Sequence, residues 1–239
     1  MARSKSKSAK KSSAPVEPQH PPRKKVLLLS CMDQRLLDDT VHFMNDLNLA
    51  NRYDHLVFAG AAMGVVHLKS GDPDAATNAA AKVVASKRSA ASQAEPVLLP
   101  WRWVFFDHLK AAIDVLRREI SDIYILEHLD CGAYRTLHPD ETIRKDYDKY
   151  CKTDMSQLKR YHADEAAKMV EQIRQFCHDQ HADAETKLDA ARAELESGSP
   201  GDLDELLKTI CYESWRLDAW KDIRIRSFIM DLTGEVEDL

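Results

Sequence analysis

The chain has 239 residues, of which 44% are hydrophobic and 31% are charged, and its formal net charge is −5. This length and composition fit one sizeable α/β domain of a soluble protein. No apolar stretch approaches the length of a membrane span, and the basic N-terminus lacks the apolar core of a secretory signal, so we expect a cytoplasmic protein. The cysteines are odd in number, five, and widely spread, which does not suggest a disulfide framework.

The first 24 residues differ from the rest in composition, being rich in Ser, Lys, Ala and Pro and almost without large apolar groups. Such a segment cannot bury enough apolar surface to offset its ordering entropy, so residues 1–24 are predicted to be a disordered basic tail. Residues 1–25 carry eight Lys or Arg and one Glu, about +7, which leaves about −12 for the remainder. The acidic remainder does not favour a nucleic-acid partner; the tail either only aids solubility or tethers the chain to an acidic partner.

A first buried strand is predicted over residues 25–30, because a short apolar run is typical of a parallel strand covered on both faces. Cys31, Asp33 and Arg35 follow it directly. The spacing of apolar residues over 37–49 then predicts an amphipathic helix.

A second strand is predicted over residues 55–59, and the small residues at 60–65 allow close approach of the backbone to its neighbours. Residues 67–100 are interpreted as an insertion, with a helix over 75–85 followed by an Ala/Ser-rich stretch of low complexity. We expect a tolerated surface excursion there, and a functional lid is the alternative.

The segment 101–119 has the apolar period of a helix, which would pack on the sheet and lead into a third strand over 123–127. A strand–helix–strand crossover of this kind makes the strands parallel. His128 and Cys131 follow the third strand, and a further helix begins after Cys131. The positive end of that helix dipole would help to keep a thiolate ionised.

About residues 140–215 are predicted to be a helical extension, with a long charged helix over 154–197 and a further helix over 202–215. The alternating residues 223–229 predict a strand with one exposed face and an edge position. For residues 25–239 we therefore expect a single α/β domain: a mostly parallel four-stranded sheet with an antiparallel edge strand, flanked by helices, with added C-terminal helices.

A metal site is predicted where the strands end. In an open α/β sheet, ligands lie beyond the carboxyl ends of the strands, so Cys31, His128 and Cys131 should emerge at one edge. Two thiolates and an imidazole, with one position left open, form the ligand set of a catalytic zinc site rather than a structural one.

The two strand-end motifs, Cys-x-Asp-x-Arg and His-x-x-Cys-Gly, together resemble the signature of the β-class carbonic anhydrases over roughly residues 25–137. The resemblance implies reversible hydration of carbon dioxide to bicarbonate by a zinc-bound hydroxide. It also implies that Cys31, His128 and Cys131 are the zinc ligands.

The same resemblance assigns roles to Asp33 and Arg35. It implies that Arg35 holds Asp33 so that this carboxylate accepts a hydrogen bond from the hydroxide. It also implies that a released Asp33 can take the fourth zinc position in a closed state. The family is built from dimers, so a homodimer or higher homo-oligomer is expected. In the family an Arg-Asn pair follows the second strand, whereas residues 58–61 here read Phe-Ala-Gly-Ala and the pair is missing.

Two other functions remain open on the same scaffold. One is hydrolysis of COS or CS2, and the other is a zinc-binding scaffold or regulatory protein without turnover. A redox protein is less favoured because no two cysteines have a Cys-x-x-Cys spacing. Carbon dioxide hydration also needs a proton shuttle, for which the candidates are His55, His67, His108 and His138.

Overall fold

The computed structural model describes residues 25–69, 100–150, 153–198 and 201–239. The basic tail, the helix predicted over 75–85 and nearly all of the segment interpreted as an insertion therefore lie outside the described residues. None of the helices in the described part of the chain combines the length and the apolar character that crossing a bilayer requires.

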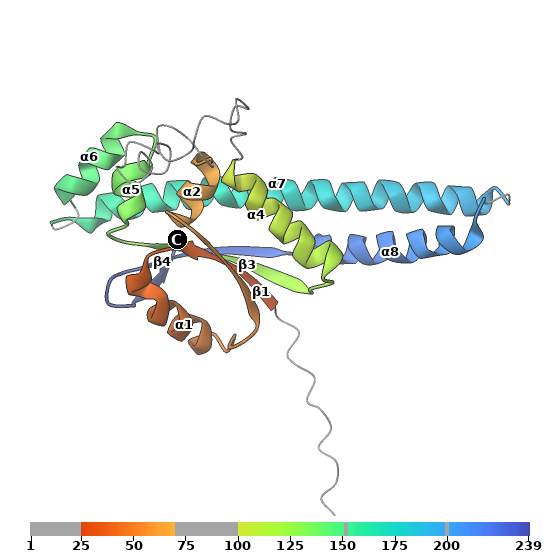
Figure 1. Cartoon of the computed structure of the whole chain (residues 1–239), viewed down its shortest axis with the longest axis horizontal. Helices are drawn as coiled ribbons and strands as arrows, with labels where there is room; N and C mark the ends of the chain where they lie inside the picture. Colours follow the sequence, from red (N-terminus) through yellow and green to blue (C-terminus); the bar gives the residue numbers. More distant parts are fainter. Residues whose placement is uncertain (1–24, 70–99, 151–152, 199–200) are drawn as a thin grey trace, which may run out of the picture.

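A five-stranded sheet lies at the centre of the fold (Figure 1). Its strands, in the spatial order β2-β1-β3-β4-β5, are β2 (Tyr53–Phe58), β1 (Lys25–Cys31), β3 (Ile120–His128), β4 (Arg224–Met230) and β5 (Val236–Asp238). Strands β1 to β4 are parallel, and β5 pairs antiparallel with β4 at the edge. This arrangement confirms the predicted fold class of a mostly parallel four-stranded sheet with an antiparallel edge strand.

The edge position predicted for residues 223–229 is wrong. β4 lies between β3 and β5, because the short strand β5 returns along its outer side. The alternating sequence instead reflects the exposure of the side chains. The first four residues of β4 alternate between exposed and half-buried, and its last three are buried.

Helices cover both faces of the sheet (Figure 1). In chain order the helical elements are the 3₁₀ turn η1 (Gln34–Leu36), α1 (Leu37–Asp46), α2 (Ala61–His67), α4 (Trp101–Lys110), the π-helical turn η3 (Ala111–Val115), α5 (Gly132–Leu137), α6 (Glu141–Tyr150), α7 (Met155–Glu196) and α8 (Leu203–Lys221). The helix predicted over 101–119 is thus present as α4 and η3, ending at Val115.

The apolar strand residues divide between two cores, because successive side chains of a strand point to opposite faces. On one face Leu28 packs in a cluster with Met44 of α1. On the other, Leu27 and Leu29 belong to a cluster that includes Met169 of α7. Burial on both faces explains why β1 is a continuous apolar run rather than an alternating one.

Helices α7 and α8 form an antiparallel hairpin that extends well past the sheet (Figure 1). α7 has 42 residues, so at about 1.5 Å per residue it is roughly 60 Å long. Asp154 and Asp202 cap the two helices, each accepting a hydrogen bond from a backbone N–H of the first turn. α8 continues to Lys221, beyond the predicted end at 215, and this extra length buries Trp220.

The hairpin is tied together by Arg216, whose side chain is 3% exposed. Its Nη1 donates to Glu213 Oε2 at 2.8 Å and to Asp183 Oδ2 at 2.9 Å. Its Nε lies 3.3 Å from Asp114 Oδ1 of η3, which also accepts a hydrogen bond from Trp220 Nε1. One guanidinium therefore links α7, α8 and the turn that precedes β3.

Replacing Arg216 by Ala is expected to lower the free energy of unfolding by about 3–5 kcal/mol, because it leaves buried carboxylates without their cation. The measurement is urea denaturation. The matched control is Arg192→Ala. The Arg192 side chain is 56% exposed, and its Nη1 lies 4.0 Å from Asp189 Oδ1, which is a weak ion pair. Its loss should therefore change the free energy of unfolding by no more than about 0.5 kcal/mol. Equal, small effects of the two variants would show that the buried network does not stabilise the hairpin.

Candidate metal centre

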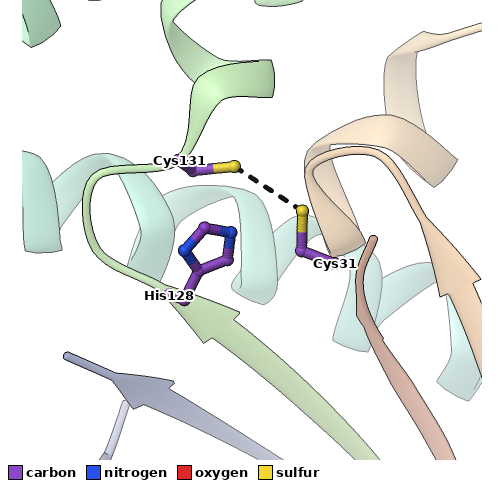
Figure 2. Close-up of side chains that lie close together, drawn as sticks. All are labelled: Cys31, His128 and Cys131. Atoms are coloured by element: carbon purple, nitrogen blue, oxygen red, sulfur yellow. Dashed lines mark hydrogen bonds between the residues drawn. The ribbon is translucent and has the colours of Figure 1, made fainter. Parts of the chain in front are cut away.

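The structure brings together the three side chains that the strand-end motifs singled out. Cys31 is the last residue of β1, His128 is the last residue of β3, and Cys131 immediately precedes α5 (Figure 2). Their possible ligand atoms all lie within 4.8 Å of one another, and the two Sγ atoms are 3.8 Å apart. Two thiolates bound tetrahedrally at about 2.3 Å are themselves about 3.8 Å apart, so the sulfur positions fit one metal ion.

The imidazole of His128 is oriented as a metal ligand. Its Nδ1 lies 2.8 Å from the carbonyl oxygen of Leu129. Because a carbonyl only accepts, Nδ1 carries a proton, and in the neutral ring Nε2 therefore presents a lone pair. Nε2 is buried and has no hydrogen-bond partner among the described residues. A buried acceptor without a partner is costly, and a metal ion at Nε2 would satisfy it.

The two thiols form a hydrogen-bonded pair in which the pKa of one is lowered and that of the other is raised. The pKa of Cys31 is lowered to about 4, chiefly because the Cys131 thiol donates a hydrogen bond to it, with burial opposing and His128 and the Gly60 N–H assisting. The pKa of Cys131 is raised well above its usual range by the Cys31 thiolate beside it and by burial. A second thiolate therefore forms readily only when a cation enters the site.

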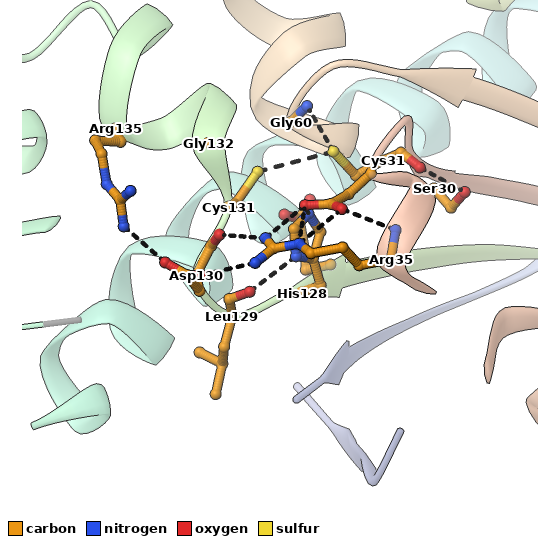
Figure 3. Close-up of polar contacts among 12 residues, drawn as sticks. Ser30, Cys31, Arg35, Gly60, His128, Leu129, Asp130, Cys131, Gly132 and Arg135 are labelled. Carbon is orange, nitrogen blue, oxygen red and sulfur yellow. Dashed lines mark hydrogen bonds and ion pairs between the residues drawn. The ribbon is translucent and has the colours of Figure 1, made fainter. Parts of the chain in front are cut away.

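The segment that replaces the Arg-Asn pair contacts the site directly. Gly60 donates its backbone N–H to Cys31 Sγ at 3.3 Å (Figure 3). Gly60 and Ala61 are both left-handed, with φ of 77° and 43°. The close approach predicted for residues 60–65 is confirmed at Gly64, where a Cβ would lie 2.1 Å from the carbonyl oxygen of Ala59.

Asp33 faces the metal centre and is held by Arg35. Arg35 donates to its carboxylate from Nη2 at 2.7 Å, from Nε at 3.0 Å and from the backbone N at 3.1 Å. These hydrogen bonds lower the pKa of Asp33 to about 2, although partial burial opposes the shift. Asp33 Oδ2 lies 4.0 Å from Nε2 of His128. An ionised carboxylate is thus fixed next to the cluster.

Asp130, which lies between His128 and Cys131, pairs with two arginines. It accepts from Arg35 Nη1 at 2.9 Å and from Arg135 Nη2 at 2.6 Å (Figure 3). Arg35 therefore joins the first motif to the second. Arg135 was not singled out from the sequence; its position one turn after Cys131 in a predicted helix was the available signal.

A second group of possible ligands, His67, His138 and Glu165, lies between α2, α5 and α7. His67 Nε2 is 2.8 Å and His138 Nε2 is 3.4 Å from the carboxylate, to which Lys168 also donates at 2.8 Å. The backbone N–H of Asp140 donates to His138 Nδ1, so the ring proton is on Nε2 and faces Glu165. This tautomer and the nearby ammonium make the group a charge-compensated contact rather than a metal site.

None of the four histidines considered as proton shuttles contacts the group Cys31, His128 and Cys131. His55 Nε2 lies 2.7 Å from Ser30 Oγ, and His108 is an exposed residue of α4. His67 and His138 are engaged with Glu165. The identity of a proton shuttle therefore stays an open prediction.

Comparison with known proteins gives few matches. No protein-family model matches the chain. An uncharacterized protein of Rickettsia bellii (strain RML369-C) is 26% identical over 117 residues, which is 49% of this chain and 53% of that protein. The chain thus spans about half the length of this curated relative.

Among solved structures, the β-carbonic anhydrase CafD of Aspergillus fumigatus aligns at 13% identity over 94% of each chain, with a TM-score of 0.36. CafA of the same fungus aligns at 16% identity over 91% of this chain and 76% of its own, with a TM-score of 0.31. The β-carbonic anhydrase CcaA aligns at 13% identity over 90% of this chain and 79% of its own, with a TM-score of 0.33.

The Glu165 contact predicts a pH dependence of stability. Burial alone would raise the pKa of this carboxyl, but hydrogen bonds from His138, His67 and Lys168 outweigh it and hold the pKa well below its usual value. The ionised Glu165 therefore stabilises the fold at pH values above about 4.3, the pKa of a glutamate in the unfolded chain. This stabilisation is lost as the pH falls through the lower pKa that Glu165 has in the folded chain. Melting temperatures between pH 7 and pH 3 should fall less steeply for Glu165→Gln than for the unchanged chain. Glu171→Gln, an exposed change on the same helix, is the control, and identical slopes for all three proteins would contradict the prediction.

Proposed function

We propose that the chain catalyses the reversible hydration of carbon dioxide to bicarbonate with one zinc ion held by Cys31, His128 and Cys131. The observation that supports this most directly is the buried Nε2 of His128, which has no hydrogen-bond partner among the described residues and lies beside two sulfur atoms at metal-binding separation. Among the described residues this group offers three possible ligand atoms. Three protein ligands leave one coordination position open, which is typical of catalytic rather than structural zinc.

Zinc in such a site supplies a nucleophile at neutral pH, because it lowers the pKa of water from 15.7 to about 7. The chain's own contribution is orientation. The carboxylate of Asp33 is ionised and can only accept a hydrogen bond, so it holds a proton-bearing oxygen with the lone pair turned toward the substrate. The three donors of Arg35 keep that carboxylate from rotating, and Asp130 keeps Arg35 from leaving.

The closed state, in which Asp33 takes the fourth position on the metal, requires Arg35 to release the carboxylate. Arg35 is held at its far end by the carboxylate and the backbone carbonyl of Asp130, at 2.9 and 3.0 Å. These contacts favour the arrangement in which Asp33 stays paired with Arg35, so that it would not bind a metal itself. COS and CS2 would use the same residues, so both belong in the same assays as alternative substrates.

The metal assignment predicts one zinc per chain. Cys131→Ser is expected to lose most of the bound zinc, because a hydroxyl is a poor replacement for a thiolate ligand. Zinc is measured on purified protein by elemental analysis, with folding checked by circular dichroism. Cys211→Ser is the control: Cys211 is an exposed free thiol, so its removal should leave the zinc content unchanged. Full zinc retention in Cys131→Ser would refute the ligand set.

If Asp33 orients the attacking oxygen, Asp33→Ala should keep its zinc but lose turnover. The rate should fall on the order of 10²-fold or more, which is the usual effect of removing one positioned hydrogen-bonding group from an enzyme active site. Arg35→Ala should act similarly, and the double variant should be no slower than the slower single variant, because the two residues act as one unit. The assay is stopped-flow carbon dioxide hydration about one to two pH units above a zinc-water pKa near 7. A rate near that of the unchanged chain for Asp33→Ala would leave Asp33 as an ion-pair partner only.

A further inference from the structure

A fully buried carboxylate, Glu127, lies next to the metal centre, one residue before His128. Its side chain is 1% exposed and accepts three hydrogen bonds. Oε1 accepts from the backbone N–H of Ala62 at 2.8 Å, and Oε2 accepts from Tyr134 Oη at 3.2 Å and from His162 Nδ1 at 2.7 Å. No Lys or Arg of the described residues pairs with it.

The partner of Glu127 on the long helix is fixed as a donor. His162 is fully buried, and its Nε2 contacts the hydroxyl of Tyr147. A neutral ring with its proton on Nδ1 satisfies both contacts, because Nδ1 then donates to the carboxylate and Nε2 accepts from the hydroxyl. α7 therefore reaches the metal centre through the pair His162–Glu127.

The three donors to Glu127 come from α2, α5 and α7. Ala62 is the second residue of α2, and Gly60, which precedes this helix, donates to Cys31. Tyr134 lies in the first turn of α5, three residues after Cys131. Glu127 itself precedes His128 in β3. One carboxylate thus joins the strand that ends in His128 to the two helices that follow Gly60 and Cys131.

The backbone before Ala62 needs such an anchor. Gly60 and Ala61 are both left-handed, and for Ala that conformation costs about 1–2 kcal/mol. The hydrogen bond from Ala62 N–H to Glu127 Oε1 fixes the residue that directly follows the strained pair. The same pair sets the direction of the Gly60 N–H toward Cys31 Sγ.

We propose that Glu127, held by His162 of α7, is a positioning residue of the metal centre, which aims the Gly60 N–H at the Cys31 thiolate. The proposal rests on the zinc site of the proposed function. It adds that α7 supports this site through the contact of His162 with Glu127. An N–H donor to a ligand sulfur draws electron density from the thiolate and so tunes the metal. The three hydrogen bonds that Glu127 accepts offset the cost of removing its carboxyl group from water.

The test uses cobalt in place of zinc in the full chain, read by the thiolate-to-cobalt charge-transfer band and by cobalt affinity in a competition titration. Glu127→Ala and His162→Ala keep all three ligands. We expect both to bind one cobalt with a shifted band and an affinity lower by about 10- to 100-fold, the usual effect of losing an outer partner of a ligand. Glu127→Gln retains an oxygen for Ala62 N–H and should stay close to the unchanged chain in both measurements.

Glu165→Gln separates positioning from general support by α7. Glu165 ties α7 to the other end of α2 through His67, so its loss should lower the melting temperature but leave band and affinity unchanged. An unshifted band with unchanged affinity in folded Glu127→Ala and His162→Ala would overturn the proposal. If Glu127→Ala does not fold, His162→Ala and Glu127→Gln decide: equal bands in these two variants would contradict the proposal.

The outcomes also separate this inference from the proposed activity. A thiolate-to-cobalt band in the unchanged chain without carbon dioxide hydration would refute the activity while leaving the positioning role standing. Absence of any such band would refute the metal centre, and with it the role of Glu127.

Discussion

The parallel pairing of β1 with β3 brings Cys31 next to the loop that carries His128 and Cys131. The two strands run side by side in one direction up to the pair Ser30 and Leu126, so both chains leave the sheet at the same edge. Residues 100 positions apart in the sequence thereby place their sulfur atoms 3.8 Å apart. Burial of β1 and β3 under helices on both faces holds this pairing, and the ligand geometry follows from it.

Charge at the site is arranged in two layers. On the outer side, Arg35 bridges the carboxylates of Asp33 and Asp130, and Arg135 also donates to Asp130. On the inner side, Glu127 is buried and accepts hydrogen bonds from Ala62, Tyr134 and His162. The three candidate ligands lie between these layers. A divalent cation bound to two thiolates would be neutral overall, which suits a buried position next to a carboxylate.

Much of the candidate site was predictable because its possible ligands follow strand ends in sequence, and strand ends are marked by short apolar runs and turn residues. The edge strand β5 was harder to predict, since three residues with one half-buried side chain leave almost no pattern. Glu127 and His162 could not be paired from the sequence. They are 35 residues apart, and a charged residue at the end of a buried strand gives no sign of which helix will supply its donor. The left-handed Ala61 was equally hidden, because tertiary contacts and not local preference impose it.

The proposed function depends on a zinc ion held by two sulfur atoms and one imidazole, with a fourth position free for water. X-ray absorption at the zinc edge of the purified chain reads this ligand set. We expect two sulfur neighbours at about 2.3 Å and two nitrogen or oxygen neighbours at about 2.0–2.1 Å, with the multiple-scattering signature of one imidazole. Four sulfur neighbours, or a shell of nitrogen and oxygen alone, would contradict it.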